Sequence, residues 1–195
     1  IYHAIIEDCR IGNEVYIGHI GNKISNYSIG EGSIISHVFS LTARQGSSCG
    51  VGTKVSVLDE TGGRSLRIVR HLPAAVAYCM VFGKADKALM QAWEEAVEIA
   101  TSEVEERGYA VVGEGNLIAQ SGILEDISTE HSSTIIGVQH LAEGYIGCNV
   151  KMQGSIVSEH FIVEDDTHLG NCSLHHCYVG EGCRLNGGFS ARSEE

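Results

Sequence analysis

The sequence is poor in proline, in basic residues and in long apolar runs. Proline occurs once, at Pro73, beside 24 glycines, and 43% of the 195 residues are hydrophobic, which argues against a disordered chain. No apolar run approaches the roughly 18 residues that a membrane span needs. Basic residues number 13 against 25 acidic ones, so the net charge of −12 argues against nucleic acid or anionic membrane as a partner. We expect one folded domain in the cytoplasm, a portion of a longer protein.

Aliphatic residues recur at every sixth position near the start of the chain, a period that fits neither a helix nor a simple strand. Lys23 alone interrupts the frame. The positions are Ile5, Ile11, Ile17, Ile29, Ile35 and Leu41. Short strands on flat faces, each ended by a turn, would point such residues inward, and three faces would make a coil of about 18 residues. The pattern predicts a coiled parallel β-structure.

A four-residue motif, aliphatic-Gly-Glu-Gly, supports a repeated architecture. It occurs at 29–32, at 112–115 and at 179–182. Glycine permits the positive φ that a sharp corner requires. We therefore expect these glycines at the corners of successive coils.

The seven cysteines include no C-x-x-C pair, and six of them stand two residues before an aliphatic residue. These six are Cys9, Cys49, Cys148, Cys172, Cys177 and Cys183. In the six-residue frame this is the second inward position, where a small side chain faces a narrow core. We expect these thiols to be reduced and to point inward.

The repeat fails after Val57, and the pattern changes to that of an insertion. A polar turn and a β-like patch at 66–69 precede Pro73, which suits the first turn of a helix, and 86–107 has the pattern of a long amphipathic helix. We expect β-helix coils over 1–60, a helical hairpin inserted over 61–109, and further coils over 110–195, all in one continuous domain.

The frame, the aliphatic-Gly pairs and the small residue two places earlier together resemble the hexapeptide-repeat proteins of the left-handed β-helix superfamily. The insertion, beginning with 57–64, resembles a family of long bacterial hexapeptide-repeat proteins of unknown function. The resemblance implies a mainly β fold, a left-handed parallel β-helix with an inserted helical hairpin. Many members are trimeric acyltransferases with an acyl-CoA groove between subunits and a histidine base; others bind nucleotide sugars, and some hold zinc.

One short stretch is similar to the H-x-C-x-aliphatic-G motif of acyltransferases that modify UDP-linked amino sugars. It runs from His175 to Gly180, and the resemblance gives His175 the role of general base. A neutral imidazole can take the proton of a sugar hydroxyl as that hydroxyl attacks a thioester. His176 departs from the motif, because those enzymes usually have an acidic residue there. A surface role for His175 is the alternative.

The same region permits zinc as a second alternative, because histidine and cysteine are zinc ligands. The candidates crowd into ten residues: His168, Cys172, His175, His176 and Cys177. Cys172 and Cys177 are expected to point inward, away from outward histidines, so we assign no metal.

Three further residues are candidates for ligand binding because they lie near the start of the insertion. A loop or helix that leaves a β-helix commonly forms one wall of a groove. His37 precedes the insertion, and Glu60 and Arg64 stand in its first turn. Arg64 suits a phosphate or carboxylate, although a salt bridge between Glu60 and Arg64 explains the pair as well. With His176 they complete the predicted binding set.

Two functions follow as hypotheses. The first is acyl transfer from acyl-CoA, as co-substrate, to a sugar or nucleotide sugar, in a homotrimer without a covalently bound cofactor. The second is a non-catalytic β-helical scaffold or a module that binds carbohydrate or a protein partner.

Overall fold

The computed structural model describes residues 1–56, 65–82 and 86–191, and over these residues the chain is mainly β with two helices. Sixteen strands form one sheet: β1 (Ile5–Glu7), β2 (Arg10–Ile11), β3 (Tyr16–Ile20), β4 (Lys23–Ser25), β5 (Tyr27–Ile29), β6 (Ile34–Thr42), β9 (Ala110–Val112), β10 (Leu117–Thr129), β11 (Thr134–Ile136), β12 (His140–Ile146), β13 (Lys151–Gln153), β14 (Val157–Val163), β15 (His168–Gly170), β16 (Ser173–Val179), β17 (Arg184–Asn186) and β18 (Phe189–Ala191). The other elements are β7 (Lys54–Ser56), β8 (Ser65–Arg67), α1 (Ala74–Val81) and α2 (Lys87–Glu105).

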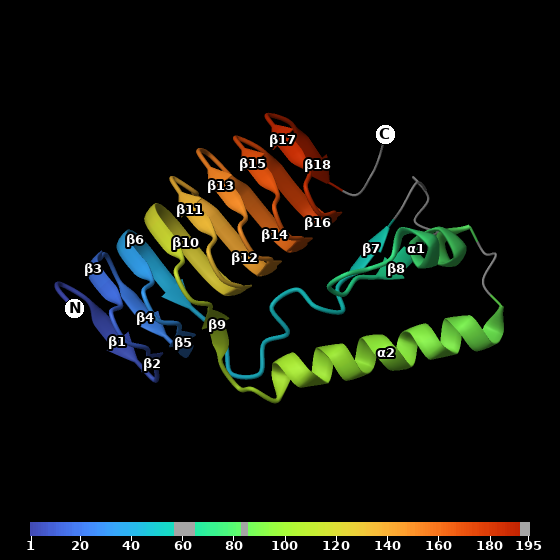
Figure 1. Ribbon diagram of the computed structural model, residues 1–195, viewed down its shortest axis with the longest axis horizontal. Helices are drawn as coiled ribbons and strands as arrows, with labels where there is room; N and C mark the ends of the chain where they lie inside the picture. Colours follow the sequence, from blue (N-terminus) through green and yellow to red (C-terminus); the bar gives the residue numbers. More distant parts are fainter. Residues whose placement is uncertain (57–64, 83–85, 192–195) are drawn as a thin grey trace.

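The large sheet is a coil of parallel strands, which confirms the predicted parallel β-helix-like architecture. Figure 1 shows the strands rising as a staircase, each over the strand of the coil before it. The coils shorten along the chain: Ile5 pairs with Lys23, 18 residues on, Leu117 pairs with Thr134, 17 on, and His168 pairs with Arg184, 16 on. The expected coil of about 18 residues therefore holds only for the first part.

Each coil turns at three corners, and we name the corners A, B and C by the residues that adopt positive φ there. Corner A holds His3, His19, His37, Gln120, Gly137, Gly154, Asn171 and Gly187. Corner B holds Asp8, Asn26, Asp126, Glu143, His160 and His176. Corner C holds Glu14, Gly32, Gly115, Ser132, Asn149, Asp166 and Gly182. Glycine, asparagine, aspartate and histidine tolerate this backbone best, so the composition of the corners follows from their geometry.

The two glycines of each aliphatic-Gly-Glu-Gly motif are needed for different structural reasons. The second glycine has positive φ, as Gly32 does with φ +69, which agrees with the expected corner role. The first glycine is needed for close approach, because a Cβ on Gly30 would lie 2.6 Å from the backbone nitrogen of Glu114 in the next coil. Gly180 differs, since nothing lies within 4 Å of a Cβ added there.

The insertion leaves the coil at Thr42 and returns at Ala110, so its start is earlier than the predicted boundary at 60. The reason is that β7 pairs antiparallel with β8 in a separate sheet. Val51 and Val55 are still buried there, which is why their spacing reads as a continued repeat. A β-hairpin thus precedes the two helices of the insertion.

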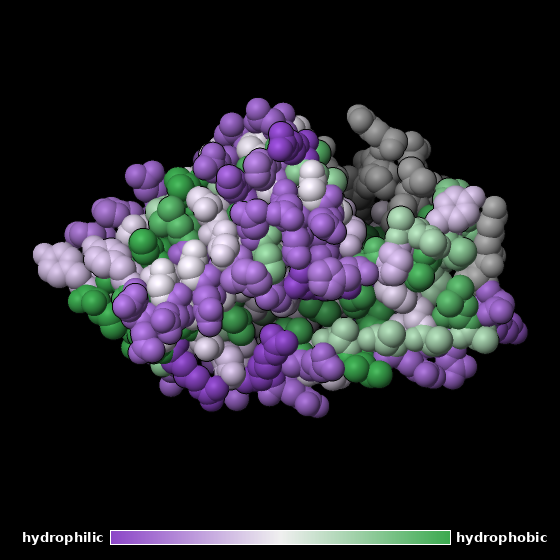
Figure 2. Space-filling model, viewed as in Figure 1, coloured by the Kyte–Doolittle hydropathy of each residue, from purple (hydrophilic) through white to green (hydrophobic). Residues whose placement is uncertain are grey.

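The helices agree closely with the pattern in the sequence. α1 follows Pro73 and packs against β8, and α2 begins where the Asp86 side chain accepts a hydrogen bond from the Leu89 N–H at 2.7 Å. The buried residues of α2 lie in its second half: Val97, Thr101 and Val104. Figure 2 shows hydrophilic residues over most of the visible face of the coil, with hydrophobic residues gathered over the insertion. Neither helix of the described chain has the length and apolar character to cross a membrane.

The two kinds of glycine predict opposite responses to an added methyl group. Gly30→Ala should lower the free energy of unfolding by about 1–3 kcal/mol, because the methyl group meets the backbone of the next coil. Gly180→Ala, the matched control, should leave it unchanged or raise it by up to about 1 kcal/mol, because the site is open and the unfolded chain loses freedom. Urea unfolding of both variants makes the comparison, and equal losses would contradict the assignment.

Candidate functional site where the insertion meets the coil

The predicted catalytic histidine lies on β16, between β14 and β18 near the C-terminal end of the coil. His175 is half-buried on β16, opposite Glu159 of β14. His176 follows at corner B, exposed, with its ring 4.6 Å from that of His160. The role of His175 as a base stays a prediction.

The other predicted binding residues lie elsewhere. His37 stands at corner A, where its ring stacks on that of His19 at 4.6 Å. The strand of His37, β6, is separated from β16 by β10, β12 and β14, so His37 does not join His175 and His176. Glu60 and Arg64 lie outside the described residues. Of the predicted residues that the structure describes, it brings together the two neighbouring histidines and leaves His37 apart.

The insertion is held on corner C by Arg70 and three carboxylates. Arg70 Nη1 donates to Glu130 Oε1 at 2.9 Å, and Arg70 Nη2 donates to Asp165 Oδ1 at 2.9 Å. Arg70 Nη2 also lies 3.4 Å from Glu164 Oε2. The Arg70 side chain is 18% exposed and that of Glu164 only 3%, so these are largely desolvated charges. We call these four residues the Arg70 cluster.

Two of the three acidic residues of the cluster, Glu130 and Glu164, occupy places where other coils have glycine. Two positions before each corner C residue stand Gly12, Gly30, Gly113, Glu130, Gly147, Glu164 and Gly180. Glu130 and Glu164 flank Gly147, where an added Cβ would collide with the Asp165 carboxylate. The missing side chain thus makes room for the contact between Asp165 and Arg70.

Glu164 also fixes the chain that follows Arg70. The His71 N–H donates to Glu164 Oε1 at 2.6 Å, and the Tyr178 hydroxyl donates to the same oxygen at 3.1 Å. The Tyr178 hydroxyl in turn accepts the Leu72 N–H at 3.1 Å. Burial and the neighbouring Glu164 carboxylate raise the pKa of Tyr178 well above its usual value. Burial and the hydrogen bond to Glu130 likewise raise the pKa of Tyr145 to about 12.

A hollow of about 560 Å³ opens beside this network. Its walls come from both parts of the chain: His71, Leu72, Ala74, Ala77, Glu164, Tyr178, Gly180 and Glu181. Apolar walls with a few polar groups are typical of small-ligand sites. We call it the seam hollow.

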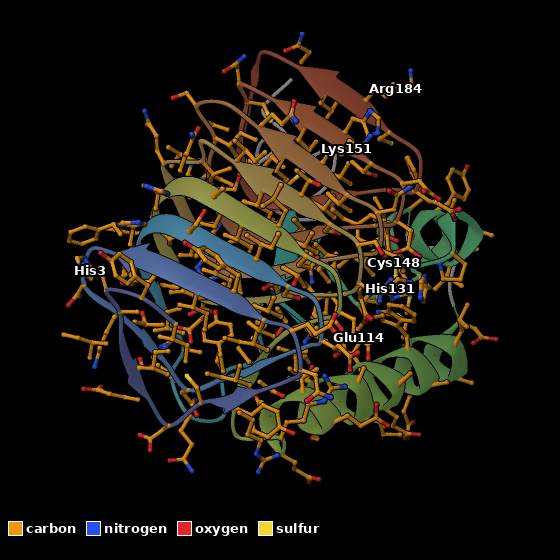
Figure 3. The ribbon with its side chains drawn as sticks, turned by 60° about the vertical axis from the view of Figure 1, so that its left-hand side comes forward. His3, Glu114, His131, Cys148, Lys151 and Arg184 are labelled. Carbon is orange, nitrogen blue, oxygen red and sulfur yellow. The ribbon has the colours of Figure 1, made fainter. Side chains whose placement is uncertain are left out.

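His131 and Cys148 lie at corner C on successive coils. Figure 3 shows the two side chains at the edge of the coil that faces the helices, with Glu114 near them and His3 on the opposite side. Cys148 Sγ lies 3.4 Å from His131 Nδ1. The expectation that Cys148 points inward is wrong, because the chain turns at Asn149 and the preceding residue of each corner C faces outward. Cys49 and Cys172 are buried as expected.

The zinc ligands considered from the sequence are not the ones that the structure gathers. Cys172 is buried and Cys177 packs against the core. Within the described residues, the group whose ligand atoms approach closely enough for a metal ion is Glu130, His131 and Cys148.

Fold and site together define a β-helix-like protein with an insertion anchored on one corner. The chain matches the family model described as a domain of unknown function (DUF4954) over residues 1–194, and it belongs to that family. No curated protein and no solved structure matches the chain. The resemblance to hexapeptide-repeat proteins stays a prediction.

Removing Arg70 should destabilise the protein far more than removing an exposed cation. Arg70→Leu leaves the buried Glu164 carboxylate without a compensating charge, and we expect the free energy of unfolding to fall by about 3–5 kcal/mol. Lys23→Met, the control, breaks the exposed pair with Glu7 and should cost under about 1 kcal/mol. Chemical unfolding compares the two, and similar losses would show that the Arg70 cluster does not anchor the insertion.

The raised pKa of Tyr178 predicts a loss of stability in alkali. The neutral hydroxyl is favoured in the folded state, so its contribution is complete below the usual pKa of 10.0 and is lost as pH rises toward the higher folded value. Tyr178→Phe should weaken stability at neutral pH and flatten part of this decline, whereas Tyr16→Phe, which alters an exposed ring, should not. The test is the melting temperature of each variant measured from about pH 8 to about pH 11. Parallel curves of melting temperature against pH for wild type and Tyr178→Phe would refute the prediction.

Proposed function

We propose that this chain is a non-catalytic β-helical module that binds neutral carbohydrate in the seam hollow. The observation that carries the proposal is the hollow itself, which lies between two parts of the chain that the Arg70 cluster fixes in place. A fixed hollow loses little freedom on binding a ligand.

The chemistry of the walls favours sugar hydroxyls. Leu72, Ala74 and Ala77 offer an apolar wall, and Tyr178 adds an aromatic side chain to the lining. Glu181 is exposed and accepts hydrogen bonds, so it can receive hydroxyl donors.

The charge of the walls disfavours a nucleotide sugar in this place. Glu164 and Glu181 are both acidic, and Arg70, which contacts Glu164, is already engaged with three carboxylates. A diphosphate would meet like charges at short range. A neutral mono- or disaccharide meets none.

We keep the finer features of the fold as part of the proposal. A left-handed coil of the hexapeptide-repeat kind is consistent with the six-residue aliphatic frame and with the positive-φ corners that recur in most coils. A trimer and a cytoplasmic location stay predictions; light scattering tests the first. Acyl transfer by His175 is the competing hypothesis, supported by its place opposite Glu159.

A panel of ligands separates the two functions. N-acetylglucosamine, maltose, acetyl-CoA and UDP-glucose are titrated into the chain by calorimetry. We expect a neutral sugar to bind, Gly180→Leu to abolish its binding by filling the hollow, and Glu181→Gln to weaken it at least about 10-fold through the loss of a charged hydrogen bond. Glu31→Gln, at the same place of corner C in a distant coil, is the control.

Two outcomes would overturn the proposal. Sugar binding that survives Gly180→Leu would place the ligand elsewhere. Binding of acetyl-CoA together with acyl transfer that is lost in His175→Ala would establish the enzyme instead.

A further inference from the structure

Three side chains with different ligand atoms converge at corner C, outside the seam hollow. The carboxylate of Glu130, the imidazole of His131 and the thiol of Cys148 each offer one atom, and these atoms all lie within 4.8 Å of one another. Glu130 and His131 follow β10, and Cys148 follows β12 in the next coil. The pairing of Thr129 with Ile146 sets His131 directly beside Cys148, as Figure 3 shows.

We propose that Glu130, His131 and Cys148 bind one Zn²⁺ ion. Sulfur, imidazole nitrogen and carboxylate oxygen are the ligands that zinc takes in proteins, whereas magnesium and calcium prefer oxygen alone. Three protein ligands leave a fourth tetrahedral position for water or for an added ligand. The site goes beyond the proposed carbohydrate binding and does not depend on it.

The surroundings orient the ligands before a metal arrives. Glu130 Oε1 accepts hydrogen bonds from the Tyr145 hydroxyl at 2.7 Å and from Arg70 Nη1 at 2.9 Å, which holds this oxygen in place. The Cys148 N–H donates to Asp165 Oδ1 at 2.8 Å, which fixes the turn that carries the thiol. Partners of this kind hold ligands in place in known metal sites.

The position of the ligands allows an ion to enter. His131 is exposed, and Glu130 and Cys148 are half-buried, so the three atoms face a solvent-accessible edge. Glu114 occupies the position of His131 in the previous coil, and Asp165 occupies the position of Cys148 in the next coil. These carboxylates offset the charge of Arg70 and favour a cation at the edge.

The sequence alone gives this site a recognisable spacing. His131 and Cys148 are one coil apart, and a one-coil spacing stacks side chains on the same corner. The earlier set around His175 lacks this property, because its five members fall within ten residues of the chain.

The test uses the full chain after treatment with a chelator. Titration with Zn²⁺ by calorimetry should give one ion per chain, and Co²⁺ should give the near-ultraviolet absorption of a thiolate–cobalt bond. Cys148→Ser should abolish that absorption and, like His131→Ala, weaken zinc binding at least about 10-fold. Both residues lie at an accessible edge, so unchanged thermal unfolding will show that the variants still fold.

Cys177→Ser is the matched control, since it removes the cysteine of the competing cluster beside His175 and His176. Its zinc affinity and cobalt spectrum should equal those of the wild type. Absence of zinc binding by the wild type, binding unchanged in Cys148→Ser, or binding lost in Cys177→Ser would each overturn the proposal.

Discussion

The close stacking of one coil on the next is the constraint on which this molecule depends. Parallel strands in register bring the backbones of successive coils to about 4.8 Å, and every corner must repeat at that spacing. At corner C this leaves no space for a Cβ in the first glycine of the motif, as Gly30 and Gly113 show. At the corner residue itself it demands positive φ, which glycine, asparagine, aspartate and histidine tolerate. Much of the unusual composition follows from these two demands.

The same constraint explains how the insertion is held. A corner that is glycine in most coils becomes a binding place when glutamate takes that position in two coils separated by Gly147. The two carboxylates then reach outward on either side of a bare backbone, and Arg70 lies between them. Removing one partner of such a pair leaves a largely buried charge unpaired, so arrangements that separate Arg70 from these carboxylates are disfavoured. The orientation of the insertion therefore depends on a local exception in the repeat.

The fold could be predicted from the sequence because its signals are local and periodic. Ile17, Ile29 and Ile35 lie on the six-residue frame and are buried at 0 to 2% exposure. Ile5 on the same frame is 58% exposed, because it pairs with Lys23 in the outward register, while its neighbour Ile6 pairs with the buried Ile24. The start of the insertion was harder to predict, because alternating aliphatic residues suit a parallel coil and the antiparallel β7–β8 hairpin equally well.

The site was hidden for a different reason. Arg70 meets Glu130 and Asp165 from 60 and 95 residues away, and no local pattern encodes such a contact. The indication of the site in the sequence was a break in a pattern: the six-residue repeat becomes irregular around Glu130 and His131. The inward assignment of Cys148 failed because the distance to the next aliphatic residue does not distinguish a core position from the outer side of a corner. Alignment of the chain by whole coils, 17 residues in this part, would have paired Cys148 with His131.

Departures from the repeat therefore carry more functional information than the repeat itself. Regular positions are fixed by stacking, so a residue that fits them has an explanation already. Glu130, Glu164, His131 and Cys148 are not required by stacking, and all four fall on corner C in three consecutive coils. The insertion covers this same corner. A surface that is both irregular in sequence and fixed by a second part of the chain is where a specific ligand, whether sugar or metal ion, finds a rigid set of contacts.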